Sequence, residues 1–150
     1  MSLPHALVLV TSLVLCATPS VPPAELRLTE IFGSVGARGL ELSAKARGLE
    51  GGRVRMTGYM VHREEDRPGS FLLAPFPVQL HDREYGLADD LPAATIVVEG
   101  PVLTGRAISH TSRLLALTGT LRLGPREEAD GRISFVRLVL DAPPSAVPSF

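Results

Sequence analysis

The sequence predicts a mainly β protein, a small OB-like barrel of five to six strands with one short helix. Residues 53–62 place Val54, Met56 and Met60 in one row and mostly polar residues in the other, which is the period of a half-buried strand. Residues 114–123 repeat this pattern with leucines. The strand–helix–strand spacing of a parallel sheet is not found, and a small β-sandwich is the alternative fold.

Each of these two long strands carries a glycine in its apolar row, Gly58 in the first and Gly119 in the second. Glycine weakens a strand, so inside one it usually marks a bend, a bulge or a close approach of another backbone. Strands of a small closed barrel need such bends. We therefore interpret Gly58 and Gly119 as structural positions. The alternative is that each glycine leaves room for a ligand.

Ahead of the first long strand, residues 26–32 (LRLTEIF) alternate well enough to predict a short strand, and residues 33–39 predict a glycine-rich turn. A short helix follows, because apolar residues recur at i, i+4 and i+7 from Leu42. Ser43 is its expected N-cap and Gly51 its C-terminal stop. We expect this helix to close one end of the barrel.

Beyond the first long strand, residues 70–75 and 95–99 are mostly apolar and predict two short strands, the second buried on both faces. Residues 102–107, in the connection that follows, are a candidate for a further strand. The Asp-Gly pair at 130–131 is a strong signal for a hairpin reversal. Residues 133–141 then complete the hairpin as the last strand.

The N-terminal stretch has the pattern of a secretory signal. Residues 6–16 (ALVLVTSLVLC) form an apolar run of h-region length, followed by small and turn-forming residues. The run is too short for a transmembrane helix, so no membrane span is expected. We predict that residues 1–20 are a signal peptide and that the mature protein is periplasmic or secreted. A buried strand is the alternative, and lipidation of Cys16, which would make a lipoprotein, is a second route to the envelope.

The rest of the 150-residue chain predicts one domain over residues 21–142, followed by a loose proline-rich tail at 143–150. The formal net charge is −1. A nucleic-acid-binding domain usually carries a basic imbalance, so no nucleic-acid partner is expected. The sequence contains no tryptophan, and only Tyr59 and Tyr85 supply tyrosine rings as contacts for a partner.

The irregular segment 78–92 carries an imidazole and several carboxylates, which are ligand types that zinc accepts. Their spacing matches no established metal motif, and a polar surface loop is the alternative. Hydroxyl residues flank His110, which could indicate a hydroxyl nucleophile, yet no G-x-S-x-G elbow surrounds them. We therefore expect a non-enzymatic protein. Apart from the zinc alternative, no cofactor is expected. The candidate zinc ligands are His81, Asp82, Glu84, Asp89 and Asp90.

The stretch GGRVRMTGYMV followed by SFLLAPFP resembles an uncharacterised family of small bacterial exported proteins. The resemblance covers residues 42–100 and is most specific in the first long strand. After the second strand this chain has PVQLHDREYGLADDLP, where some members carry cysteine or an NQ-containing segment. The matching positions are Leu49, Gly51, Arg53, Val54, Met56, Gly58, Tyr59, Met60, Phe71, Leu72, Leu73 and Pro75.

Members of that family are often encoded near ABC-type permeases, sometimes in metal-responsive settings. The resemblance therefore implies a periplasmic accessory or binding role beside an envelope ABC-type transport system, with no established reaction. A divalent-metal-binding protein that uses the segment 78–92 is the second hypothesis from the sequence.

Overall fold

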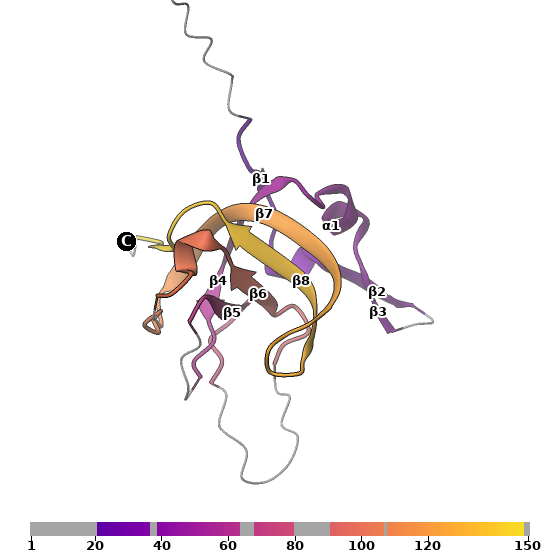
Figure 1. Ribbon diagram of the computed structural model, residues 1–150. Helices are drawn as coiled ribbons and strands as arrows, with labels where there is room; N and C mark the ends of the chain where they lie inside the picture. Colours follow the sequence, from indigo (N-terminus) through magenta and orange to yellow (C-terminus); the bar gives the residue numbers. More distant parts are fainter. Residues whose placement is uncertain (1–20, 37–38, 64–67, 80–90, 107, 149–150) are drawn as a thin grey trace, which may run out of the picture.

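A computed structural model describes residues 21–36, 39–63, 68–79, 91–106 and 108–148 of the chain (Figure 1). The predicted signal peptide with Cys16 lies outside the described residues. So does most of the predicted metal segment, residues 80–90.

Five strands form a closed hydrogen-bonded ring. The main sheet has the order β1-β4-β5-β6-β8-β7-β9, and an additional pairing joins β4 (Arg53–Met60) to β7 (Leu114–Glu127). This pairing closes a ring that also contains β5 (Ser70–Ala74), β6 (Ile96–Glu99) and β8 (Ile133–Leu140). Strands β6 and β8 run parallel, and the other neighbours in the ring are antiparallel. The predicted mainly β fold with one short helix is confirmed.

The inward rows of the ring strands build the core. Along β4 the side chains alternate between exposed and buried, with Val54 and Met56 almost fully buried. This period of two is the one that the sequence predicted. The largest fully buried side chains are Leu26, Ile31, Val54, Met56, Leu73, Ile96, Val98, Leu117, Leu121 and Leu138.

Neighbouring atoms closely approach both strand glycines. A Cβ at Gly119 would collide with the carbonyl oxygen of Val139 and would lie 2.8 Å from its carbonyl carbon. A Cβ at Gly58 would lie 2.7 Å from Cδ1 of Leu28 and 2.8 Å from the carbonyl oxygen of Ala74. Protein atoms therefore occupy the space beside both glycines, and no room for a ligand is left there.

The strand expected at residues 26–32 is not present. The segment instead holds a 3₁₀ turn, η1 (Leu28–Glu30), and it follows a two-residue strand, β1 (Ala24–Glu25), that pairs in parallel with β4. A 3₁₀ turn brings residues i and i+3 to one side, and both Leu28 and Ile31 are buried. The spacing of three between the apolar residues 28 and 31 fits this turn, whereas the spacing of two between residues 26 and 28 resembles that of a strand.

The expected turn at 33–39 is mostly a hairpin. Strands β2 (Phe32–Gly36) and β3 (Gly39–Leu42) form a separate two-stranded sheet that projects from the side of the ring (Figure 1). Val35 and Leu40 face each other across it and are 77% and 43% exposed. The glycines at the inner ends of these two short strands made the sequence resemble a turn.

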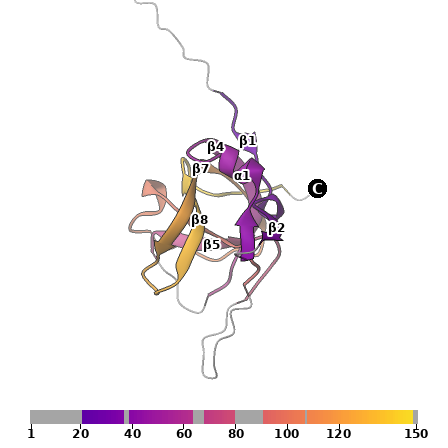
Figure 2. The ribbon, with the colours of Figure 1, turned by 90° about the vertical axis from the view of Figure 1, so that its right-hand side faces the viewer.

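The predicted helix is present as α1 (Ala44–Gly48). The hydroxyl of Ser43 accepts a hydrogen bond from the backbone N–H of Ala46 at 3.0 Å, as expected of an N-cap. In Figures 1 and 2, α1 lies at the end of the ring away from the β7–β8 turn. Ala46 is fully buried there.

Two segments near the C-terminus differ from expectation. Residues 102–107 hold no strand among their described residues, and a 3₁₀ turn, η2 (Pro101–Leu103), begins at the proline. The proline-rich tail was expected to be loose, yet β9 (Ser145–Ala146) pairs with β7 beside Leu115 and Ala116.

Candidate functional site

A pocket of about 420 Å³ lies beside β5, β6 and β8, and its lining includes Phe71 and Val136 of the main core as well as residues outside that core. Leu72 of β5 and Val97 of β6 form part of its lining and belong to a small apolar cluster separate from the main core. The β7–β8 turn (128–132) borders one side and residues 91–95 border another. Because these segments are far apart in the sequence, only the closed ring brings them together.

The pocket joins a buried apolar floor to an exposed apolar rim. Leu72 and Val97 are each 8% exposed, whereas Ile133 and Phe135 on β8 are 52% and 54% exposed. Apolar side chains that continue from a buried floor to an exposed rim are typical of binding surfaces.

An ion-pair network fixes the β7–β8 end of the pocket. The guanidinium of Arg126 donates to both carboxylate oxygens of Glu99, at 2.9 and 2.6 Å, and to Glu128 at 2.9 Å. These bonds, first those to Glu99 and then those to Glu128, raise the pKa of Arg126 above its ordinary value. Ser134 donates a hydrogen bond to Glu128, so the network continues to β8.

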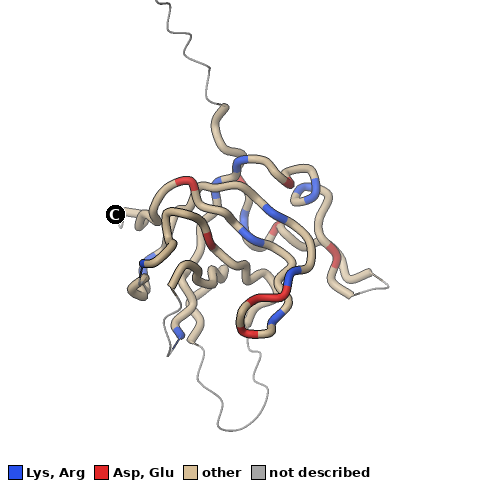
Figure 3. Tube along the Cα trace, in the orientation of Figure 1, with Lys and Arg blue, Asp and Glu red and all other residues tan. Residues whose placement is uncertain are grey.

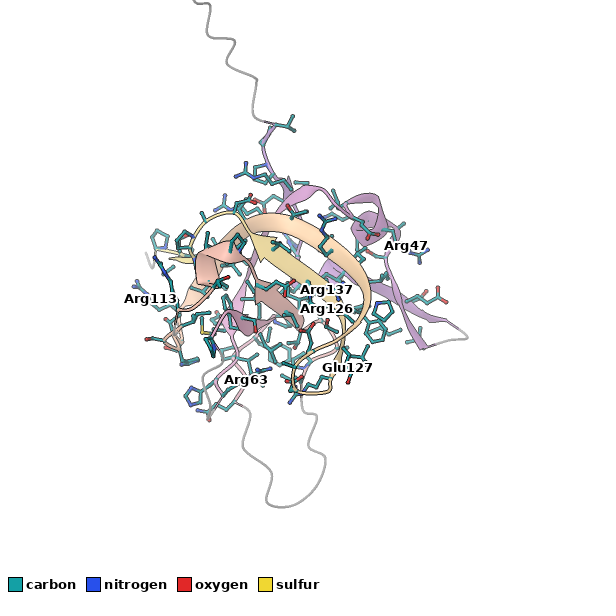
Figure 4. The ribbon with its side chains drawn as sticks, viewed as in Figure 1. Arg47, Arg63, Arg113, Arg126, Glu127 and Arg137 are labelled. Carbon is teal, nitrogen blue, oxygen red and sulfur yellow. The ribbon has the colours of Figure 1, made fainter. Side chains whose placement is uncertain are left out.

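Arg137 is the one buried charged residue among those that the structure describes, with 8% exposure. Its guanidinium donates to the carbonyl oxygen of Gly124 at 2.9 Å and to the hydroxyl of Ser134 at 3.0 Å (Figure 4). The register of β7 against β8 shifts between Leu123 and Arg126, beside this bond. Sequence reasoning did not find Arg137, because an arginine in an outward row of a strand normally predicts solvent exposure.

A second charged group lies at the tip of the turn. The Asp130 carboxylate is 3.8 Å from the guanidinium groups of both Arg63 and Arg132, and it accepts a hydrogen bond from the Arg132 backbone N–H at 3.2 Å. Acidic and basic residues accordingly gather around the β7–β8 turn (Figure 3). Because Arg63 follows β4, this group joins two connections of the ring.

Thr95 also lines the pocket. Its side-chain oxygen is buried and has no hydrogen-bond partner, although its backbone N–H donates to the carbonyl of Pro92 at 2.8 Å. Most buried hydroxyls in proteins are hydrogen-bonded, so an exception requires an explanation.

Of the partner-contact and metal-ligand candidates predicted from the sequence, the structure describes Tyr59, which does not line this pocket. Tyr59 is half-buried on β4, whereas Tyr85 and the candidate zinc ligands His81, Asp82, Glu84, Asp89 and Asp90 lie outside the described residues. Within the described parts of the chain, no three His, Cys, Asp or Glu side chains gather as a metal site would require. The zinc site therefore stays a prediction.

The structure does bring together two histidines that the sequence places far apart. The rings of His62 and His110 meet edge to face with their centroids 4.5 Å apart. A ring nitrogen of His110 lies 3.3 Å from the carbonyl oxygen of Met60. These contacts attach the connection before β7 to the end of β4.

Comparison with known proteins identifies the fold but not a function. No family model and no curated protein matches the chain. The structure is similar to the crystal structure of a DUF3299 family protein from Pseudomonas aeruginosa PAO1, with a TM-score of 0.57 and 13% sequence identity. The match covers 87% of this chain and 99% of that chain. At this identity the likeness shows a shared fold, and that protein carries a domain of unknown function.

Replacing Arg126 with methionine is expected to lower the free energy of unfolding by about 1–2 kcal/mol. The change leaves Glu99 and Glu128 facing each other, 25% and 20% exposed, without their shared cation. Because Arg126 is itself 40% exposed, solvent screening keeps the loss below that of a fully buried pair. Urea denaturation measures it. The control Arg122→Met, at an exposed position on the same strand, should change stability little, and equal losses in both variants would contradict the prediction.

Proposed function

We propose that this protein is a non-enzymatic binding protein of the bacterial envelope and that it receives its partner at the pocket on β5, β6 and β8. The observation that carries the proposal is the continuity between the buried floor, Leu72 and Val97, and the exposed rim, Ile133 and Phe135. A partner that covers this phenylalanine and isoleucine would remove their apolar surface from water, which is favourable for binding.

The electrostatics of the pocket favour binding over catalysis. A general acid or base must be able to reach the substrate, yet Glu128 is bonded to Arg126 and Ser134. Asp130 likewise lies between two guanidinium groups. These contacts hold the carboxylates in place as part of a rigid frame around an apolar surface.

The envelope location and the type of partner rest on the sequence. The apolar run at 6–16 supports export, and the family resemblance supports a partner in an ABC-type transport system. Among the described residues, no helix has the length and apolar character needed to cross a membrane. We therefore propose an accessory domain outside the inner membrane that contacts a component of such a system.

Removing the apolar rim is expected to abolish capture of the envelope partner. In the variant Ile133→Thr/Phe135→Thr, threonine keeps the preference for strand conformation while the large apolar surface is lost. Chemical crosslinking in intact cells, followed by affinity purification and mass spectrometry of the envelope fraction, measures capture. We expect the wild-type chain to retain one identified envelope protein and the variant to lose it.

The matched control is Val35→Thr/Leu40→Thr, which removes two exposed apolar residues of the β2–β3 hairpin that are not part of the pocket lining. Circular dichroism should show that both double variants keep the fold. If both variants capture the partner as well as the wild-type chain does, the pocket is not the binding surface. An uncleaved chain in the cytoplasm would contradict the envelope location.

A further inference from the structure

We infer that a second pocket, beside the start of β7, binds a small carboxylic acid with an apolar chain, and that the guanidinium of Arg106 pairs with its carboxylate. This second pocket has a volume of about 360 Å³, and no described residue lines both it and the pocket on β5, β6 and β8. The inference therefore goes beyond the proposed function. It follows from an apolar floor, a lining without an acidic group, and an arginine that has no partner among the described residues.

The floor of the second pocket belongs to the main core. Met60, Leu103 and Leu115 are 6%, 3% and 3% exposed, and the half-buried Val102 and Ile108 pack against the same core. A volume of about 360 Å³ lies near the lower end of the range of small-molecule pockets. The second pocket therefore suits a short apolar chain, which would remove this surface from water.

The C-terminal tail forms one wall of the second pocket. Pro143, Pro144 and Ala146 line it, on the side of the ring where the C-terminus lies (Figure 1). The backbone N–H of Val147 donates to the carbonyl oxygen of Leu114 at 2.8 Å and holds this wall against β7. The wall carries no charged side chain, so it offers apolar contact to the chain of the ligand.

A tight turn places Arg106 beside the floor. Gly105 has a φ of +69°, a left-handed conformation that favours glycine, and the backbone N–H of Arg106 donates to the carbonyl oxygen of Leu103 at 3.2 Å. The side chain of Arg106 is exposed and lines the second pocket. It forms no hydrogen bond or ion pair with any residue that the structure describes. The turn thus presents a free cation beside an apolar cavity.

No described residue in the lining of the second pocket carries a carboxylate. Its polar side chains other than Arg106 are the hydroxyl residues Ser109 and Thr111. The acidic residues that precede the two lining segments, Glu99 and Asp141, are each bonded to an arginine outside the lining. Because the lining offers one positive charge and hydroxyl groups, an anion is the ligand group that complements it.

A single guanidinium favours a carboxylate over a phosphate. Its planar fork matches the two oxygens of a carboxylate in a bidentate pair. A phosphate monoester carries about two negative charges at neutral pH, so one arginine would leave part of that charge uncompensated beside an apolar wall. The ligand is therefore a monocarboxylic acid whose chain covers Leu103 and Leu115.

Octanoate is the probe, and 1-octanol, octylamine and octyl phosphate present the same chain with other head groups. Each is titrated into the isotope-labelled full chain at about 0.15 M salt, and the NMR shifts of the Leu103, Ile108 and Leu115 amides report binding at the second pocket. We expect octanoate to bind about fivefold or more tightly than 1-octanol, and octylamine to bind most weakly. Hexanoate should bind about tenfold more weakly than octanoate, because it lacks two methylene groups.

Arg106→Met should weaken octanoate binding about five- to tenfold and leave 1-octanol binding unchanged, because methionine keeps an apolar side chain and removes the charge. The control Arg122→Met removes the same charge at an exposed position outside the lining, so it should leave both affinities unchanged. Ile133→Thr/Phe135→Thr should not change octanoate binding either, because both residues line the other pocket.

Any of four results would overturn the inference. They are no shift of the three amides at about 3 mM octanoate, equal affinities for octanoate and 1-octanol, tighter binding of octyl phosphate than of octanoate, and equal octanoate affinity of Arg106→Met and the wild-type chain. These results concern the second pocket alone. The crosslinking experiment with Ile133→Thr/Phe135→Thr decides the proposed function separately.

Discussion

Replacing Gly119 with alanine should lower the free energy of unfolding by about 3 kcal/mol or more. The new Cβ would collide with the carbonyl oxygen of Val139 and would lie 3.0 Å from Cα of Leu140. Both contacts are with backbone atoms, which cannot rotate away as a flexible side chain can. Gly119 is also paired to Val54 of β4 on one side and to Leu140 of β8 on the other, so its own strand has little freedom to move.

Urea denaturation followed by circular dichroism measures this loss. Gly48→Ala is the matched control, because Gly48 lies in α1 and a Cβ there would meet no atom within 4 Å. Alanine is the better helix former, so the control should gain up to about 1 kcal/mol. Equal unfolding midpoints for Gly119→Ala and the wild-type chain would show that β7 and β8 are not as close as the structure places them.

Leu28→Ala should cost about 2–4 kcal/mol, although the residue belongs to a short N-terminal turn outside the ring. Its side chain is 2% exposed and packs within the main core, with Cδ1 directed at Gly58. Deleting this side chain removes buried apolar area and leaves a cavity at the centre of β4. Thermal or urea unfolding measures the change, and Leu40→Ala on the exposed hairpin serves as the control.

A double-mutant cycle tests whether Leu28 and Gly58 contact each other. Gly58→Ala alone should destabilise, because its Cβ would lie 2.7 Å from Leu28 Cδ1. In the Leu28→Ala background that contact is absent, so the cost of Gly58→Ala should fall, while the contact with the Ala74 carbonyl remains. Additive costs would mean that Leu28 does not occupy the space above Gly58.

Strand periodicity predicted the long strands β4 and β7 because each has one face fixed by the core, whereas β5 and β6 were predicted from their apolar runs. The row of Val54, Met56 and Met60 is visible in the sequence since the opposite row meets water. The N-terminal segment gave a misleading pattern because a 3₁₀ turn with buried residues at 28 and 31 begins like a strand. The β2–β3 hairpin was missed because glycines dominate both ends of its turn.

The candidate site could not be predicted from local patterns. Glu99 and Arg126 belong to different strands that are brought close only through β8, which pairs with both β6 and β7. Thr95 reads as an ordinary residue at the start of a strand, since the absence of a hydrogen-bond partner depends on its neighbours in three dimensions. The exposure of Phe135 likewise depends on which segments pack against β8, and a local sequence pattern does not specify them.

The short strand β9 has a consequence for the behaviour of many copies of this protein together. The first part of β7 is bonded to β4 on one edge, while β8 reaches only as far back as Gly119 on the other. Ser145 and Ala146 occupy the remaining stretch of that second edge, and the prolines at 143, 144 and 148 frame them with residues that cannot donate a backbone hydrogen bond. An open edge invites the strand of another molecule. The C-terminal segment thus covers the stretch of β7 at which neighbouring molecules would otherwise add to the sheet.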